Sequence, residues 1–212
     1  DEINTLAVKI AKEAASEFST STWPRFVAGA MGPTTKTLSV TGGITFEELE
    51  ENFYKQAYSL VKAGSDLILL ETSQDMLNVK AATIGINRAF EELNTVLPVM
   101  ISGTIEPMGT TLAGQSIEAF YISIEHIKPL SVGLNCATGP EFMTDHIRSL
   151  SDLATSYVSC YPNAGLPDEE GCYHETPDSL SKKLRGFADK GWLNIVGGCC
   201  GTTPAHIAAI RE

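Results

Sequence analysis

The sequence predicts an α/β protein built on a parallel sheet. Short apolar runs alternate with segments of helical periodicity, and this strict alternation is typical of α/β folds. The apolar runs are nearly continuous in hydrophobicity, as expected of strands that are buried on both faces. No two consecutive runs are joined by a hairpin signal, which favours parallel over antiparallel strands.

The first elements follow from local signals. Residues 3–18 place their apolar side chains mostly on one face of a helix, and 25–30 form an apolar run that a Gly-Pro turn closes. A second helix is predicted over 45–63, because Thr45 and Glu48 have the spacing of a capping box. The chain therefore opens with a helix, a strand and a helix.

The remaining elements rest on the same kinds of signal. Apolar runs predict five more strands, over 66–71, 98–102, 131–136, 156–161 and 193–197. Periodicity predicts the helices between them, over 76–94, 115–128, 140–154 and 176–190, with a short one after Pro204. Prolines in the first turn and glycines after the last turn, such as Pro140 and Gly191, support these boundaries.

Six strands are two fewer than a (β/α)8 barrel contains, and 212 residues fall short of its typical length of about 250. The chain also begins in a helix that no predicted strand precedes. We therefore expect residues 1–212 to form a single domain, a (β/α)8 TIM barrel that lacks its first strand–helix–strand portion. A six-stranded doubly wound sheet is the alternative.

Charge and hydropathy exclude several classes of partner. The chain has 15 Lys and Arg against 26 Asp and Glu, a net charge of −11, which disfavours nucleic acid and anionic membranes as ligands. No apolar run approaches the ~18 residues that a membrane helix needs, and the first residues do not form a basic-then-apolar leader. We expect a cytoplasmic protein without a membrane or nucleic-acid partner.

Polar residues gather where the predicted strands end. In a TIM barrel these positions converge on one mouth, where active sites lie. They are Glu71 and Thr72, then Ser102, Gly103 and Thr104, then Asn135 and Cys136, and finally Asn163 and the pair Cys199-Cys200. Polar residues at the ends of so many strands indicate a functional site.

Three of the five cysteines lie at these strand ends: Cys136, Cys199 and Cys200. Adjacent side chains of a strand point to opposite faces, so Cys199 and Cys200 can share an ion only after the chain has turned, and flanking glycines such as Gly201 allow that turn. Three thiolates suit Zn²⁺ and leave a fourth position open, as in catalytic sites. Separate buried thiols and a vicinal disulfide are the alternatives.

Two widely spaced motifs resemble the zinc-dependent homocysteine S-methyltransferase family. They are Gly-Leu-Asn-Cys-Ala at 133–137 and Gly-Gly-Cys-Cys-Gly-Thr-Thr-Pro at 197–204. The likeness extends over nearly the whole chain. Its segment Gly-Pro-Thr-Thr-Lys-Thr-Leu-Ser at 32–39 is most similar to the homocysteine-binding modules of cobalamin-dependent methionine synthases.

The resemblance implies a TIM barrel that binds zinc through its three strand-end cysteines, with the homocysteine sulfur in the open position. Asn163 is implied as the fourth ligand when substrate is absent, and Glu71 as the carboxylate that receives the substrate ammonium group. The other implied substrate contacts at the same mouth are Thr72, Ser102, Gly103, Thr104 and Asn135. Methylcobalamin would be the methyl donor, bound on another domain, and the partners would be the cobalamin- and folate-binding domains of a parent enzyme.

Alternatives remain at this point. A stand-alone or reductase-fused homocysteine S-methyltransferase would use another methyl donor, and a redox or zinc-sensing protein would use Cys199 and Cys200 as a vicinal dithiol. The family's first strand ends in an Asp-Gly-x-x-Gly-Thr loop that the residues before Ile3 do not supply, so we expect incomplete activity from this chain alone. Open barrel edges at 25–30 and 193–197 predict self-association.

The remaining thiols and imidazoles receive simpler interpretations. Cys160 is expected to be a buried strand thiol, and Cys172 is expected in a loop, as a competitor for zinc. His174 follows in the same loop and is a weak candidate for a contact behind the ligands. His206 is expected to act at a helix end.

Overall fold

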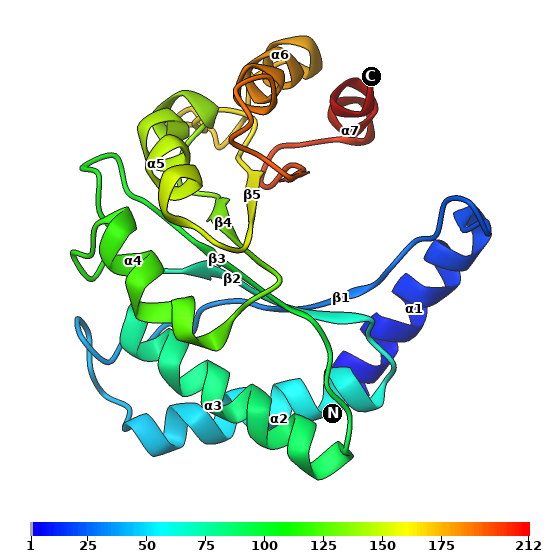
Figure 1. The fold of residues 1–212 in the computed structure, drawn as a ribbon, viewed down its shortest axis with the longest axis vertical. Coiled ribbons are helices and arrows are strands. Elements are labelled where there is room, and N and C mark those ends of the chain that lie inside the picture. Colours follow the sequence, from blue (N-terminus) through cyan, green and yellow to red (C-terminus); the bar gives the residue numbers. More distant parts are fainter. Residues whose placement is uncertain (1) are drawn as a thin grey trace. The chain divides into compact units, whose positions relative to one another are not determined.

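The computed structural model describes residues 2–212, which adopt an α/β fold with six parallel strands (Figure 1). The strands are β1 (Ala28–Met31), β2 (Leu67–Ser73), β3 (Val99–Gly103), β4 (Ser131–Asn135), β5 (Tyr157–Tyr161) and β6 (Ile195–Val196), and they lie in the sheet in this order. A doubly wound sheet reverses its strand order at a switch point. The uninterrupted order therefore excludes that alternative and confirms the α/β prediction.

All six predicted strands are present, with different ends. β1 begins at Ala28 instead of Arg25, and β6 is reduced to Ile195–Val196. β6 is short because the chain leaves the sheet after Val196 for a glycine-rich loop, described below.

The helices are α1 (Glu2–Phe18), α2 (Phe46–Lys62), α3 (Met76–Leu93), α4 (Ile117–Ile124), α5 (Pro140–Leu153), α6 (Pro177–Ala188) and α7 (Pro204–Arg211). The predicted capping box of α2 is present: Thr45 N donates to Glu48 Oε2 at 2.9 Å, and Glu48 N donates to Thr45 Oγ1 at 3.2 Å. The helix predicted over 115–128 is shorter, because a 3₁₀ turn follows α4 and Lys128, before Pro129, is left-handed at φ 53°.

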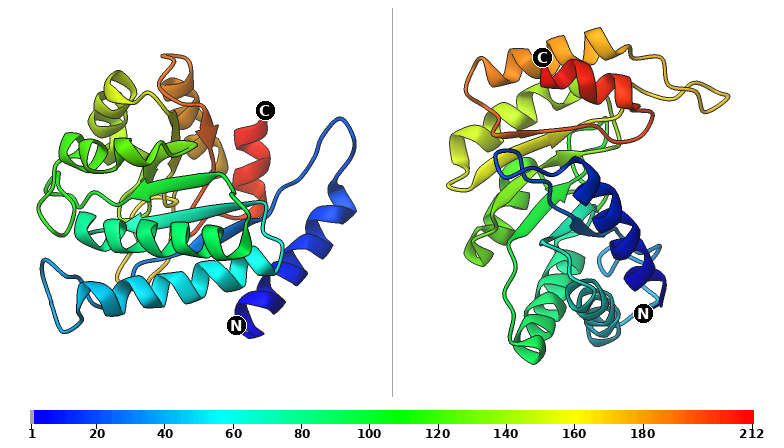
Figure 2. Two further views of the ribbon diagram at one scale, coloured as in Figure 1. Left: turned by 60° about the horizontal axis from the view of Figure 1, so that its bottom comes forward. Right: turned by 90° about the vertical axis from the view of Figure 1, so that its right-hand side faces the viewer.

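Close contacts group the described residues into two compact units, one made of the residues up to Glu71 with Leu77–Met100, the other of Thr72–Met76 with Ile101–Glu212. In the first unit α2 and α3 run side by side (Figure 2). Arg88 on α3 joins them through ion pairs with Glu50 and Glu51 on α2, at 3.6 and 2.8 Å.

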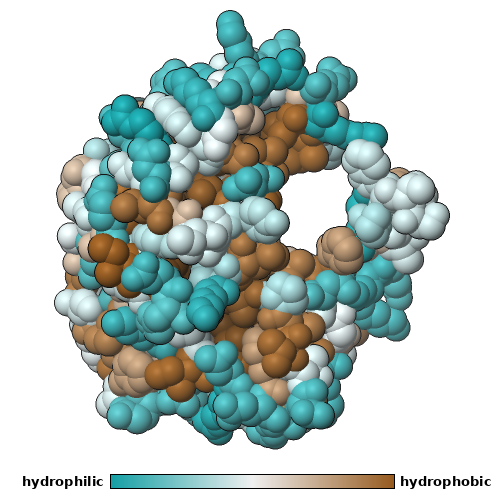
Figure 3. Space-filling view, viewed as in Figure 1, coloured by the Kyte–Doolittle hydropathy of each residue, from teal (hydrophilic) through white to brown (hydrophobic). Residues whose placement is uncertain are grey.

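The helix α1 of the first unit keeps much of its apolar face at the surface. Ile3, Ile10 and Phe18 are 82%, 65% and 69% exposed, and Val8 is the buried residue of this helix. Hydrophobic residues, brown in Figure 3, are visible at the surface in several places. The amphipathic pattern of α1 therefore has little to pack against within this chain.

In the second unit, α5, α6 and α7 lie together beside β4 and β5 (Figure 1). All five residues of β4 are buried, as expected of a central parallel strand. Asn135 at its end lies level with Tyr161 of β5, and Cys160 pairs with Val196 of β6. The carboxyl ends of these three strands therefore bring the loops that follow them to one place.

No helix of the described residues combines the length and the apolar character needed to cross a lipid bilayer.

Candidate metal centre

Three thiols that are far apart in the sequence meet at the carboxyl ends of β4 and β6. The Sγ atoms of Cys136 and Cys200 are 3.8 Å apart, those of Cys199 and Cys200 are 3.9 Å apart, and all three lie within 4.8 Å of one another. A tetrahedral site with Zn–S bonds of about 2.3 Å places its sulfurs about 3.8 Å apart. The thiols therefore have nearly the spacing that a zinc ion requires.

Cys136 leaves its strand through an unusual backbone conformation. Cys136 and Ala137 have φ values of 58° and 51°, in the left-handed region that residues with a side chain rarely adopt. Thr138 N closes the turn by donating to Cys136 O at 2.6 Å. Strained conformations of this kind concentrate at functional sites, and here the turn carries the thiol out of the sheet.

The segment after β6 is hydrogen-bonded along the segment after β5. Cys199 N donates to Pro162 O at 2.8 Å, and Ala164 N donates to Cys200 O at 2.9 Å. These two bonds fix the backbone of both cysteines relative to β5.

Two glycines make this loop possible. A Cβ on Gly198 would lie 2.4 Å from Thr202 Cγ2, so no side chain fits there. Gly201 has φ +77° and provides the turn that the sequence predicted.

Asn135 lies beneath the thiols and uses all its hydrogen-bonding capacity. Its Oδ1 accepts from Thr72 N at 3.0 Å and from Ser102 Oγ at 2.7 Å. Its Nδ2 donates to Thr72 Oγ1 at 2.9 Å and to Cys199 Sγ at 3.9 Å. A side-chain amide has two donor hydrogens and two acceptor sites, so these four contacts use the full hydrogen-bonding capacity of this fully buried side chain. Asn135 is therefore a support that orients Cys199.

Thr72 and Thr104 belong to the same network. Thr72 has φ 57°, an outlier for a β-branched residue, and its two bonds to Asn135 hold it there. Thr104 Oγ1 lies 3.4 Å from Asn135 O. The strained backbone at the end of β2 is thus stabilised by the residue that supports the thiols.

Burial, together with the nearby sulfurs of Cys136 and Cys200, raises the pKa of Cys199 to about 12. Burial also raises the pKa of Cys136, and the sulfur of Cys200 adds to the rise. N–H groups act in the opposite direction: that of Ala137 lowers the pKa of Cys136, and the Asn135 amide lowers that of Cys199. Without a cation the thiols of Cys136 and Cys199 are therefore held protonated, and a cation beside them would lower their pKa values instead.

The structure brings most of the predicted site residues together. Cys136, Cys199, Cys200, Thr72, Ser102, Thr104 and Asn135 form one connected group. Gly103 lies in β3, and a Cβ there would lie 2.7 Å from the Phe120 ring. Asn163 is buried next to the group, and its Oδ1 accepts from Cys200 N at 3.2 Å. Glu71 is half-buried in β2 and belongs to the first unit, so its role in binding substrate stays a prediction.

The other cysteines and histidines have separate partners. Cys160 is fully buried beside Met143 Sδ, as expected. Cys172 is exposed and lies outside the thiol group, and His174 pairs with Asp168 at 2.6 Å. His206 caps α7 through Thr203, in agreement with the predicted helix-end role.

Sequence reasoning missed one residue of the site, Tyr173. Its ring lies against Gly201, since a Cβ on that glycine would be 2.3 Å from Tyr173 Cγ. The only available signal was its position between Cys172 and His174, in a loop considered only for those two residues.

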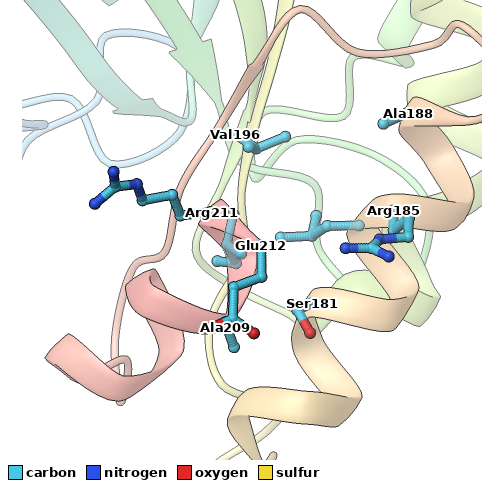
Figure 4. A pocket seen from close by; sticks show the side chains of 9 residues that line it. Ser181, Arg185, Ala188, Val196, Ala209, Arg211 and Glu212 are labelled. Atoms are coloured by element: carbon cyan, nitrogen blue, oxygen red, sulfur yellow. The ribbon is translucent and has the colours of Figure 1, made fainter. Parts of the chain in front are cut away.

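A pocket between α6 and α7 is separate from the thiol group (Figure 4). It is lined by Ser181, Arg185, Val196, Ala209 and Arg211 among others, and its lining includes no cysteine. Among the residues described, Cys136, Cys199 and Cys200 are the one cluster with the composition and spacing of a metal site.

Comparison with known proteins gives a consistent result. A family model described as homocysteine S-methyltransferase matches residues 1–212. The chain is similar to the homocysteine methyltransferase MmuM from Escherichia coli in its apo form, with a TM-score of 0.77 and 20% identity over 99% of this chain and 72% of that chain. The metallated form of MmuM gives 0.76 and 21%, over 99% and 69%. The oxidized form gives 0.77 and 21%, over 99% and 70%.

At this identity the similarity to MmuM establishes the fold alone. The six strands match part of a TIM barrel, and the sheet within this chain is not closed. The prediction of a partial TIM barrel with six strands is therefore confirmed.

Proposed function

Since the chain belongs to the homocysteine S-methyltransferase family, we propose that it binds zinc through Cys136, Cys199 and Cys200 and that the homocysteine thiol is methylated at this centre to give methionine. The observation that carries the proposal is the spacing of the three sulfurs, 3.8 and 3.9 Å for the two pairs that involve Cys200. Three protein thiolates leave one tetrahedral position for the substrate sulfur.

When bound, zinc supplies the positive charge that keeps a substrate thiol deprotonated and nucleophilic at neutral pH. The chain's own residues fix the geometry. Asn135 orients Cys199, and the hydrogen bonds of Pro162 and Ala164 hold the backbone of the cysteine pair. With zinc held by the three cysteines, the substrate sulfur would need no histidine as a base, which agrees with the separate partners of His174 and His206.

Four residues complete the proposed substrate site. Glu71 would receive the homocysteine ammonium group as its counter-charge. Asn163 would fill the fourth position before substrate arrives, since a carbonyl oxygen has two lone pairs and Cys200 N uses one of them. Ser102 and Thr104 would line the site from β3 and the residue after it.

For the methyl donor we propose methylcobalamin, bound on another domain of a methionine synthase. The segment at 32–39 supports this choice, because its residues resemble those of the homocysteine-binding modules of such enzymes. A stand-alone enzyme with a sulfonium or betaine-like donor is the competing possibility.

The metal proposal is tested first by measuring zinc per chain by mass spectrometry on the folded protein. We expect about one zinc in the wild type and in Cys172→Ala, and a loss of zinc in Cys136→Ala. Cys172 is the matched control because it is an exposed thiol outside the cluster. Zinc retained in Cys136→Ala and lost in Cys172→Ala would contradict the proposed ligand set.

The competing redox function predicts a different dependence on Cys136. A vicinal dithiol made of Cys199 and Cys200 would cycle without Cys136, so Cys136→Ala would keep its full two-electron capacity. The proposed metal centre needs all three thiols, and the nearly equal distances from Cys200 to both other sulfurs support it.

The methyl donor is tested with zinc-loaded protein and homocysteine. We expect methionine to form with methylcobalamin and not with S-methylmethionine or a betaine, and Glu71→Gln to raise the KM for homocysteine. Methionine formed only with the sulfonium or betaine donor would favour the stand-alone enzyme.

A further inference from the structure

His206 joins the helix that follows the cysteine pair to a segment that is distant in the sequence. It lies in the first turn of α7 and is only 6% exposed. Its Nδ1 accepts from Thr203 N at 3.1 Å and lies 2.9 Å from Thr203 Oγ1. Its Nε2 lies 2.9 Å from the backbone oxygen of Glu175, 31 residues earlier in the chain. The imidazole thus contacts its own helix on one side and the segment before α6 on the other.

The two backbone partners of His206 determine where its proton lies. The N–H of Thr203 can only donate and the carbonyl oxygen of Glu175 can only accept, so Nδ1 is the bare nitrogen and Nε2 carries the hydrogen. Both ring nitrogens are then occupied, and neither is left to bind a metal ion or to act as a base. His206 is therefore a bridge between two backbone groups.

The segment that His206 reaches is bonded to the one that holds the cysteine pair. Glu175 N donates to Ala164 O at 3.1 Å, and Ala164 N donates to Cys200 O at 2.9 Å. Asn163 Oδ1 accepts from Cys200 N at 3.2 Å, so both backbone groups of Cys200 are bonded to residues 163–164. Glu175 holds these residues from the side away from Cys200.

The bond from His206 to Glu175 closes a ring. Hydrogen bonds lead from Cys200 through Ala164 and Glu175 to His206, and the chain itself leads back to Cys200. A loop that is fixed at both ends has less conformational freedom to lose when its side chains bind a ligand. In this ring the bond of His206 is the one that a side chain makes, so it is the one that a substitution can remove.

The anchor of this bond is itself held in place. Lys183 Nζ, on α6, lies 2.9 Å from each carboxylate oxygen of Glu175. The side chain of Glu175 is 12% exposed, and α7 lies beside α6 (Figure 2). His206 therefore binds a backbone group whose residue is fixed to the neighbouring helix.

We propose that His206 is a positioning residue of the thiol centre. By donating its Nε2 hydrogen to Glu175 O, it closes the ring that holds the turn of Cys199 and Cys200 in the geometry suited to a metal ion. The proposal rests on the proposed metal function and gives His206 a role beyond the cap of α7. Cys136 lies outside this ring, on the turn after β4.

Two substitutions separate the cap of α7 from the bond to Glu175. In a capping box the third residue of the helix is Glu or Gln, whose side-chain oxygen accepts from the backbone N–H of the N-cap residue. His206→Gln keeps this acceptor and also supplies an N–H donor for Glu175 O, whereas His206→Glu keeps the acceptor and has no donor when ionised. The two variants form a matched pair.

The first measurement needs no metal. The metal-free protein is alkylated with iodoacetamide, and the rate at each cysteine is read by mass spectrometry. In His206→Glu we expect a several-fold faster reaction at Cys199 and wild-type rates at Cys136 and Cys160. Cys136 is the control within the thiol group, and the fully buried Cys160 reports any loosening of the whole fold. His206→Gln should match the wild type at all three thiols.

The second measurement is the affinity for Co²⁺, used as a spectroscopic substitute for zinc. His206→Glu should bind Co²⁺ roughly tenfold more weakly than the wild type, because the thiols must be brought into position on binding. Its sulfur-to-cobalt bands should be unchanged, since the same three thiolates bind. His206→Gln should restore the affinity.

The outcomes separate the two proposals. A wild-type rate at Cys199 in His206→Glu, or an equal increase at Cys160, overturns the inference, since the turn is then not held by this bond. Equal losses of Co²⁺ affinity in the Gln and Glu variants overturn it as well, because the donor to Glu175 would not matter. If the wild type itself binds no Co²⁺, the metal function fails, and the alkylation rates still decide whether His206 holds the turn.

Discussion

The side-chain oxygen of Asn163 accepts a hydrogen bond from the backbone N–H of Cys200, with 3.2 Å between the two atoms. Asn163 follows β5 and Cys200 follows β6, so this bond joins the ends of two strands. It places a buried carbonyl oxygen beside the thiol group and leaves that oxygen one lone pair.

We predict that Asn163→Leu weakens zinc binding about tenfold without abolishing it, because the cysteine turn loses a bond that fixes its backbone. The affinity is measured by competition with a chromogenic chelator. Asn194→Leu serves as the control, since Asn194 also accepts from a backbone N–H, that of Val158 at 2.8 Å, at the other end of β5. Equal losses in both variants would show that the effect is one of general stability.

Zinc binding should release protons and tighten as the pH rises. Burial and neighbouring sulfurs raise the pKa of Cys136 and Cys199, so both thiols are protonated near pH 7 in the metal-free protein and must lose their protons to bind. The zinc association constant should therefore rise by at least about a hundredfold per pH unit around neutrality. Calorimetry in buffers of different ionisation enthalpy measures the release, and fewer than two protons per zinc would contradict the assignment.

The Asn135 network should contribute to stability as well as to the site. Asn135→Ala leaves Ser102 and the N–H of Thr72 without their partner, and we expect the free energy of unfolding to fall by about 2–3 kcal/mol. Ser159→Ala is the matched control, because the buried Ser159 hydroxyl has no hydrogen-bond partner among the described residues and its removal should lower the free energy of unfolding little. Urea denaturation measures both, and a smaller loss for Asn135→Ala than for Ser159→Ala would contradict the network.

Self-association is expected from two surfaces of the chain. β1 and β6 stand at the two edges of the sheet, and the apolar side chains of α1 are exposed, with Ile3 at 82% and Phe18 at 69%. We expect light scattering to give a mass above 22.7 kDa that increases with concentration. Ile3→Lys with Phe18→Lys should lower it, and a monomer at every concentration would contradict the prediction.

Much of the fold could be predicted from the sequence because its signals are local. The capping box of Thr45 and Glu48 and the prolines in the first turns of α5 and α6 act within one helical turn, and each was found as predicted. Strand ends were less certain. β6 is limited to Ile195–Val196, because the residues that follow it form hydrogen bonds with the segment after β5 instead of extending the sheet. These bonds join segments that are distant in the sequence, so no local pattern predicts them.

By itself the sequence determined the order of strands and helices, the apolar character of the strands and the presence of cysteines at two strand ends. Each of these follows from which residues are neighbours in the chain. Only the tertiary structure decided that the Sγ atoms of Cys136 and Cys200 lie 3.8 Å apart. It also decided that the Asn135 side chain makes its hydrogen bonds to Ser102, Thr72 and Cys199, and that the Tyr173 ring packs on Gly201. These distances depend on the register of β4, β5 and β6 and on the turns after them, and hydrogen bonds between distant segments set both.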